Sequence, residues 1–94
     1  MNALLLDYTH PLLEQGLEQG GICLWREYEL APKDFPSHYF TAEVVVIRSR
    51  FPVTREVINL FPNLKAIGRL GAGLENIDVD YAKSLGIPCL RVPE

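Results

Sequence analysis

The run Val44-Val45-Val46-Ile47 decides the fold class of this chain. Four β-branched side chains in succession are restricted at χ1 and suit a strand far better than a helix. A strand that is apolar on both faces is typical of the centre of a parallel sheet. Shorter apolar runs on either side of it predict four further strands, at residues 3–6, 22–25, 65–68 and 87–92.

Helix signals separate these runs. Thr9, Thr54 and Asp78 are each expected to cap a helix, and the three helices are expected at residues 9–20, 54–61 and 78–86. The residues expected on their buried faces are Leu12, Leu13 and Leu17, then Val57, Ile58 and Phe61, then Val79, Ala82 and Leu85. Residues 26–37 are expected to form a loop, with a helical turn after Pro36.

Strands that alternate with helices predict an α/β fold with right-handed crossovers. We expect a flavodoxin-like parallel sheet of about five strands with helices on both faces. The chain has 94 residues, which allows one domain with a single core. Residues 1–94 show no internal repeat and no linker.

Composition restricts the function. The formal net charge is -3, which argues against a nucleic-acid-binding surface. Cys23 and Cys89 lie far apart among apolar residues, so reduced core cysteines are expected and no metal ligation is supported. The N-terminus has no basic leader, and its apolar run is too short for a membrane span. A cytoplasmic enzyme is the expectation.

Ligands of parallel α/β sheets bind at the carboxyl ends of the strands. Arg48 and Ser49 follow the third predicted strand, and arginine's planar fork suits a carboxylate or phosphate. A solvated surface arginine is the plain alternative. Arg50 follows at once, but Arg48 is the stronger candidate because the strand ends near it.

A glycine-rich segment, Gly71-Ala72-Gly73, follows the fourth predicted strand. A G-x-G after a strand suggests a dinucleotide site, but Asn76 stands where that motif needs a third small residue. The backbone N–H groups of such a segment are able to cradle a small carboxylate. A simple strand-to-helix turn is the alternative.

No recognisable acid–base pair accompanies these residues. His10 and His38 are separate in sequence and lack a carboxylate-plus-nucleophile pattern. The chain is therefore expected to bind a ligand without itself providing catalytic residues.

The order and spacing of five segments resemble the D-2-hydroxyacid dehydrogenase family, phosphoglycerate dehydrogenases in particular. The segments are VVIRS at 45–49, VTREVI at 53–58, PNLKAIGRLGAGLENID at 62–78, GIP at 86–88 and VPE at 92–94. The resemblance covers about the second half of the chain. The first half agrees only in its strand-helix-strand order.

The resemblance implies a two-domain, NAD-dependent oxidoreductase of a D-2-hydroxy acid. Because the resemblance is to phosphoglycerate dehydrogenases in particular, the substrate it suggests is 3-phosphoglycerate and the pathway it suggests is serine biosynthesis. Residues 1–94 would be the N-terminal segment of the substrate-binding domain, incomplete without the rest of the enzyme. A Rossmann domain after residue 94 would bind NAD and carry the cofactor-binding residues. The catalytic residues would also lie outside residues 1–94. The whole enzyme would be a homodimer.

The resemblance also assigns roles to individual residues. The loop matching Ala72 and Gly73 would donate backbone N–H groups to the substrate carboxylate, and Arg48 with Ser49 would face the far end of the acid. Phe51 and Arg91 depart from the family pattern, which leaves open which 2-hydroxy acid is bound.

Two other hypotheses remain. A non-catalytic flavodoxin-like signalling module would need acidic residues after the first and third strands, whereas the chain has Asp7 after the first and Arg48 after the third. A stand-alone binding protein for a small anion is the other hypothesis.

Overall fold

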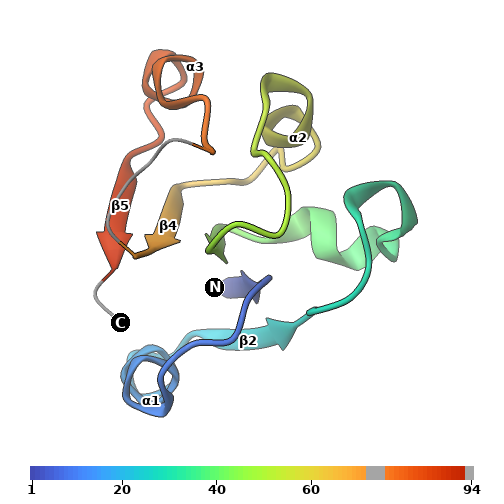
Figure 1. Cartoon of the computed structure of the whole chain (residues 1–94). Coiled ribbons are helices and arrows are strands. Elements are labelled where there is room, and N and C mark those ends of the chain that lie inside the picture. The colour runs from blue at the N-terminus through green and yellow to red at the C-terminus, as the bar shows by residue number, and fades with distance from the viewer. Residues whose placement is uncertain (72–75, 93–94) are drawn as a thin grey trace.

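The β-branched run at Val44–Ile47 forms β3, the central strand of a parallel sheet. In this computed structural model, which describes residues 1–71 and 76–92, the sheet has five strands in the order β2-β1-β3-β4-β5 (Figure 1). The other strands are β1 (Asn2–Leu5), β2 (Cys23–Arg26), β4 (Ala66–Leu70) and β5 (Cys89–Val92). The predicted flavodoxin-like α/β architecture is confirmed.

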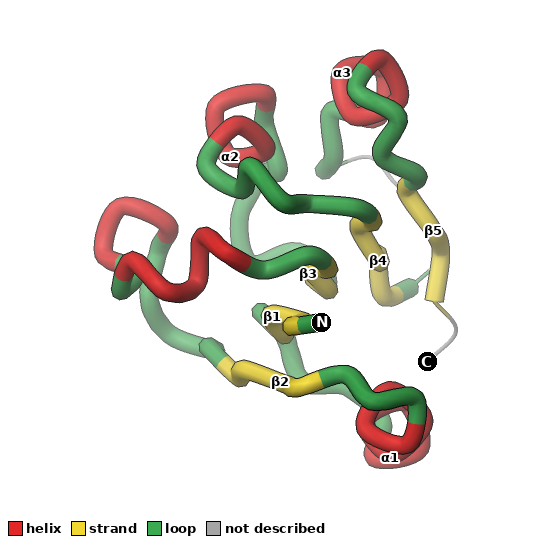
Figure 2. The backbone as a smooth tube through the Cα atoms, turned by 180° about the vertical axis from the view of Figure 1, so that it is seen from behind, coloured by secondary structure: helices red, strands yellow, loops and turns green. Residues whose placement is uncertain are grey.

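Helices cover both faces of the sheet, as expected. The helices are α1 (Pro11–Gln19), α2 (Arg55–Asn59) and α3 (Val79–Ser84), with two 3₁₀ helices, η1 (Pro32–Asp34) and η2 (Ser37–Thr41). Figure 2 shows α1 on one side of the sheet and α2 with α3 on the other. The helical turn predicted after Pro36 is η2.

Alternation along each strand divides the core between the two faces. Leu4 and Leu6 join the larger cluster under α2, α3 and the 3₁₀ helices, whereas Leu5 joins the smaller cluster under α1. All three side chains are at most 1% exposed. Full burial of a leucine contributes about 1.5–3 kcal/mol, so β1 is held firmly from both faces.

Two residues predicted on buried helix faces are in fact exposed. Leu12 is 69% exposed, because α1 turns Leu13 and Leu17, which are four residues apart, toward the sheet. Leu85 is 51% exposed, because α3 ends at Ser84 and Leu85 is already its C-cap. The predictions for both leucines were wrong.

The cap of α1 also differs from the prediction. His10 caps this helix, and its Nδ1 accepts the N–H of Leu12 at 3.1 Å. The Thr9 hydroxyl instead donates to Glu14 at 2.9 Å. Either side chain is able to cap, and the conformation of the preceding chain chooses between them.

The prediction of two free cysteines is confirmed, but the predicted burial of Cys23 was wrong. Cys23 and Cys89 are both free, but Cys23 is exposed because β2 is an edge strand with few covered residues. Cys89 is half-buried, and burial raises the pKa of its thiol. Among residues 1–71 and 76–92, no helix combines the length and apolar character needed to cross a membrane.

Candidate substrate-binding site

Three adjacent strands bring the predicted site residues to one edge of the sheet. β1, β3 and β4 are neighbours and parallel, so their carboxyl ends point the same way. Arg48 and Ser49 follow β3, and Gly71 follows β4. The sheet therefore places these three predicted residues together at the edge where parallel α/β folds bind ligands.

The backbone at Arg48 and Ser49 is tied to the end of β1. Oδ2 of Asp7 accepts the N–H of Arg48 at 2.5 Å and the N–H of Ser49 at 3.2 Å. Arg48 and Ser49 are themselves exposed. This use of the Asp7 carboxylate also speaks against a signalling module, in which that acid would serve a metal ion.

Arg50 has a structural role. Its Nη1 donates to the carbonyl oxygens of Leu6 at 3.2 Å and Glu27 at 3.0 Å, and its Nη2 donates to that of Leu30 at 2.5 Å. These carbonyls belong to the segments that follow β1 and β2. The guanidinium thus joins the ends of two strands.

Gly71 adopts a backbone conformation that favours glycine. Its φ is 106°, in the region that side chains with a Cβ rarely adopt, and its N–H donates to the Val92 carbonyl at 3.3 Å. A Cβ at Gly71 would lie 3.0 Å from Nη1 of Arg69. Ala72 and Gly73, the other predicted carboxylate ligands, lie outside the described residues.

A polar network that was not predicted from the sequence joins the segments after β3 and β4. Nε of Arg69 donates to Oδ1 of Asn76 at 2.7 Å, and Nδ2 of Asn76 donates to the Phe51 carbonyl at 3.5 Å. The N–H of Val53 donates to the Asn76 carbonyl at 2.7 Å. A charged residue inside an apolar strand, as Arg69 is, was the signal that could have revealed it.

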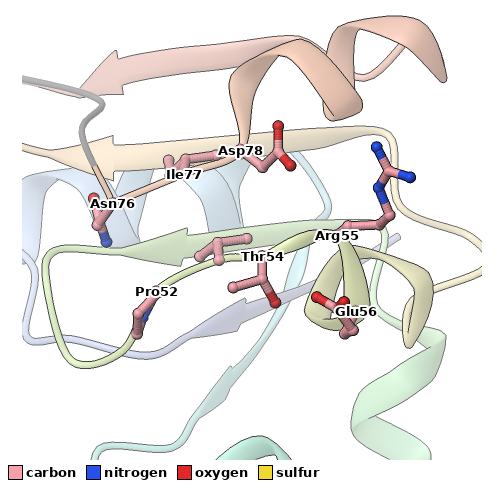
Figure 3. Close-up of a pocket in the computed structure, with 8 residues that line it drawn as sticks. Pro52, Thr54, Arg55, Glu56, Asn76, Ile77 and Asp78 are labelled. Carbon is pink, nitrogen blue, oxygen red and sulfur yellow. The ribbon is translucent and has the colours of Figure 1, made fainter.

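A pocket of about 560 Å³ lies between the entries to α2 and α3. Figure 3 shows Thr54 and Asp78 where the two helices begin, with Pro52 and Asn76 toward the other end of the pocket. Its lining does not include Arg48, Ser49 or Gly71. This pocket is therefore not formed by the predicted ligands.

The histidines are placed elsewhere. His10 caps α1, and the ring of His38 meets Trp25 edge to face at 5.1 Å between centroids. In the described parts of the chain, no group of three or more His, Cys, Asp or Glu side chains is arranged to hold a metal ion. The chemistry offered by the edge residues is anion binding by cationic and hydroxyl groups.

Comparison with known proteins assigns this chain and its fold to a family. Residues 3–94 match the family described as D-isomer specific 2-hydroxyacid dehydrogenase, catalytic domain. The chain belongs to this family. The resemblance inferred from the segments between residues 45 and 94 is thereby confirmed, and it extends over the first half as well.

Individual relatives share the sequence and the fold. The chain is 29% identical over 90 residues to D-3-phosphoglycerate dehydrogenase of Sus scrofa and 49% identical over 51 residues to hydroxypyruvate reductase of Thermotoga maritima. These alignments cover 96% and 54% of the chain, and 17% of each relative. Each alignment thus spans about a sixth of the relative's length.

Solved structures agree. A Polaromonas protein described as a D-isomer specific 2-hydroxyacid dehydrogenase superposes with a TM-score of 0.81 at 33% identity, covering 99% of this chain and 30% of that one. D-lactate dehydrogenase of Escherichia coli superposes with a TM-score of 0.78 at 26% identity, covering 100% and 31%. Members of the family with different substrates share this sheet.

Proposed function

We propose that residues 1–94 form the N-terminal segment of the substrate-binding domain of an NAD-dependent D-2-hydroxyacid dehydrogenase. The length of the relatives supports this proposal, because the alignments leave most of each relative uncovered. The NAD-binding Rossmann domain and the catalytic residues are expected in that further sequence. The whole enzyme is expected to be a cytoplasmic homodimer that assembles through the cofactor domain.

The convergence of Arg48, Ser49 and Gly71 on one sheet edge is the observation that carries the proposal. Ala72 and Gly73 are proposed to bind the substrate carboxylate through their N–H groups, because the N–H of Gly71 before them already donates to the Val92 carbonyl. Arg48 and Ser49 are proposed to bind the opposite end of the acid. Holding both ends orients C2 of the acid for reaction.

NAD would supply the hydride chemistry in such an enzyme, and its binding is proposed to belong to another domain. Asn76 stands at the third small position of the dinucleotide motif, and its amide is already used by Arg69 and Phe51. The segment after β4 therefore fits a small carboxylate better than a pyrophosphate.

The substrate is proposed to be a D-2-hydroxy acid with an anionic far end, with 3-phosphoglycerate as the leading candidate. The exposed position of Arg48 and the similarity to D-3-phosphoglycerate dehydrogenase support this choice. Similarity to hydroxypyruvate reductase makes a shorter acid the competing substrate.

The test is an assay of the full-length protein that contains this chain. Oxidation of NADH would be followed with 3-phosphohydroxypyruvate, hydroxypyruvate, glyoxylate and pyruvate, with residues 1–94 alone as the control. The full-length protein should turn over at least one 2-oxo acid, with the highest kcat/KM for the phosphorylated one, and the 94-residue chain should turn over none. Absence of turnover with all four acids would contradict the proposed reaction.

A further inference from the structure

The carboxylate of Asp7 fills a pair of backbone donors at the proposed anion site. The N–H groups of Arg48 and Ser49 point at the same oxygen, Oδ2, at 2.5 and 3.2 Å. Asp7 is half-buried and precedes these residues by 41 and 42 positions. Because β1 pairs directly with β3, the contact joins two neighbouring strand ends.

Two successive N–H groups that converge on one oxygen form an anion-binding arrangement. A ligand anion could use such a pair of donors, but here the carboxylate of Asp7 already accepts both hydrogen bonds. Hydrogen bonds to an ionised acceptor are short and about twice as strong as neutral ones. Recognition of a ligand anion at this point is therefore left to the side chains of Arg48 and Ser49.

The same turn is tied to β1 a second time. Arg50 donates to the carbonyl oxygen of Leu6, the residue immediately before Asp7. The backbone after β3 is thus held to the end of β1 by the N–H groups of Arg48 and Ser49 and by the Arg50 side chain. These contacts restrict the backbone from which the Arg48 and Ser49 side chains extend.

We propose that Asp7 is a positioning residue for substrate recognition: its carboxylate holds the backbone of Arg48 and Ser49 so that their side chains meet the far end of the acid. This inference rests on the proposed function. Asp7 acts through the backbone that it holds, because its Oδ2 accepts both N–H groups.

The kinetic test compares Asp7→Ala with Asp7→Asn in the full-length enzyme. Asp7→Ala removes the acceptor and should raise KM for the 2-oxo acid about tenfold, with kcat and KM for NADH changed less than about twofold. Asp7→Asn retains an acceptor oxygen and should stay within about threefold of the wild-type KM. Asp80→Asn, which removes an exposed acid in the first turn of α3, is the control for loss of charge.

A double-mutant cycle tests whether Asp7 acts through Arg48. In the Arg48→Ala background, Asp7→Ala should raise KM for the 2-oxo acid by less than about twofold, because the Arg48 side chain that Asp7 positions has been removed. Full additivity of the two effects, or an equal loss in kcat and both KM values, would overturn the positioning role. If Asp7→Ala does not fold, Asp7→Ser, whose shorter side chain should not bridge both amides, takes its place.

Hydrogen exchange separates this inference from the proposed reaction. The Arg48 and Ser49 amides should be protected in the wild type and in Asp7→Asn, and should lose protection in the variant without the acceptor. Protection without any dehydrogenase activity would reject the proposed function and leave the Asp7 contact intact. Activity together with an unchanged KM in Asp7→Ala would reject the positioning role alone.

Discussion

The guanidinium of Arg69 donates from Nε to Oδ1 of Asn76 at 2.7 Å. The two residues stand on either side of the segment that begins with Gly71, which is proposed to bind the substrate carboxylate. Asn76 also bonds the backbone of Phe51 and Val53. Its side chain therefore links the segments after β3 and β4, and both segments belong to the proposed site.

Replacing Asn76 by alanine should weaken both stability and substrate binding. The variant leaves the half-buried Arg69 guanidinium without this acceptor, which should cost about 1–2 kcal/mol of unfolding free energy. Urea denaturation and KM for the 2-oxo acid are the measurements. Gln15→Ala, which removes an exposed amide from α1, should change neither quantity appreciably.

Two glycine-to-alanine substitutions should have opposite effects on stability. Gly71→Ala places a Cβ 3.0 Å from Arg69 Nη1 at a φ of 106°, and should destabilise the fold by about 1–3 kcal/mol while raising KM for the acid. Gly16 lies inside α1 with nothing within 4 Å of an added Cβ, so Gly16→Ala should stabilise by about 0.5–1 kcal/mol. Thermal unfolding of both variants checks the pair, and equal shifts would contradict it.

Replacing Arg48 should affect mainly substrate binding, whereas replacing Arg50 should affect mainly stability. Arg48→Ala should raise KM for the 2-oxo acid at least tenfold, with little change in KM for NADH. Arg50→Ala removes the donor for three carbonyl oxygens and should lower stability by about 2 kcal/mol. Steady-state kinetics and differential scanning fluorimetry distinguish the two. An equal rise in KM for NADH in Arg48→Ala would instead support a dinucleotide at this edge.

Glu27 should make stability depend on pH in the acid range. The N–H of Leu30 is the largest influence that holds the pKa of Glu27 below its usual value of about 4.5, with Tyr39 and Arg50 contributing in the same direction. A lowered folded-state pKa means that the stabilisation is present above the unfolded-state pKa and is lost as pH falls through the folded one.

The measurement is urea denaturation of the wild type and Glu27→Gln between pH 7 and pH 3. The free energy of unfolding of the wild type should exceed that of Glu27→Gln most at pH 6–7, and this difference in free energy should shrink below about pH 4.5. Tyr39→Phe, which removes the phenol that donates to Glu27 at 3.0 Å, should show an intermediate pH dependence. A difference that grows toward low pH would contradict the assigned sign.

Local patterns predicted much of the fold correctly. Thr54 caps α2 by accepting the Val57 N–H at 3.3 Å, and Asp78 caps α3 by accepting the Tyr81 N–H at 3.1 Å. These interactions involve residues three positions apart, so their signals lie within one turn of sequence. Errors arose where burial depends on the rest of the molecule, as at Leu12, Leu85 and Cys23.

By itself, the sequence determined the α/β class, the central place of Val44–Ile47 and the candidate residues Arg48, Ser49 and Gly71, because apolar runs, caps and glycines act over short distances along the chain. Only the tertiary structure decided that Asp7 holds the turn at Arg48, that Arg50 joins strand ends, and that Arg69 bonds Asn76. The contacts of Asp7 with Arg48 and of Arg50 with Leu6 link residues more than 40 positions apart, so they exist only after the parallel strands have aligned.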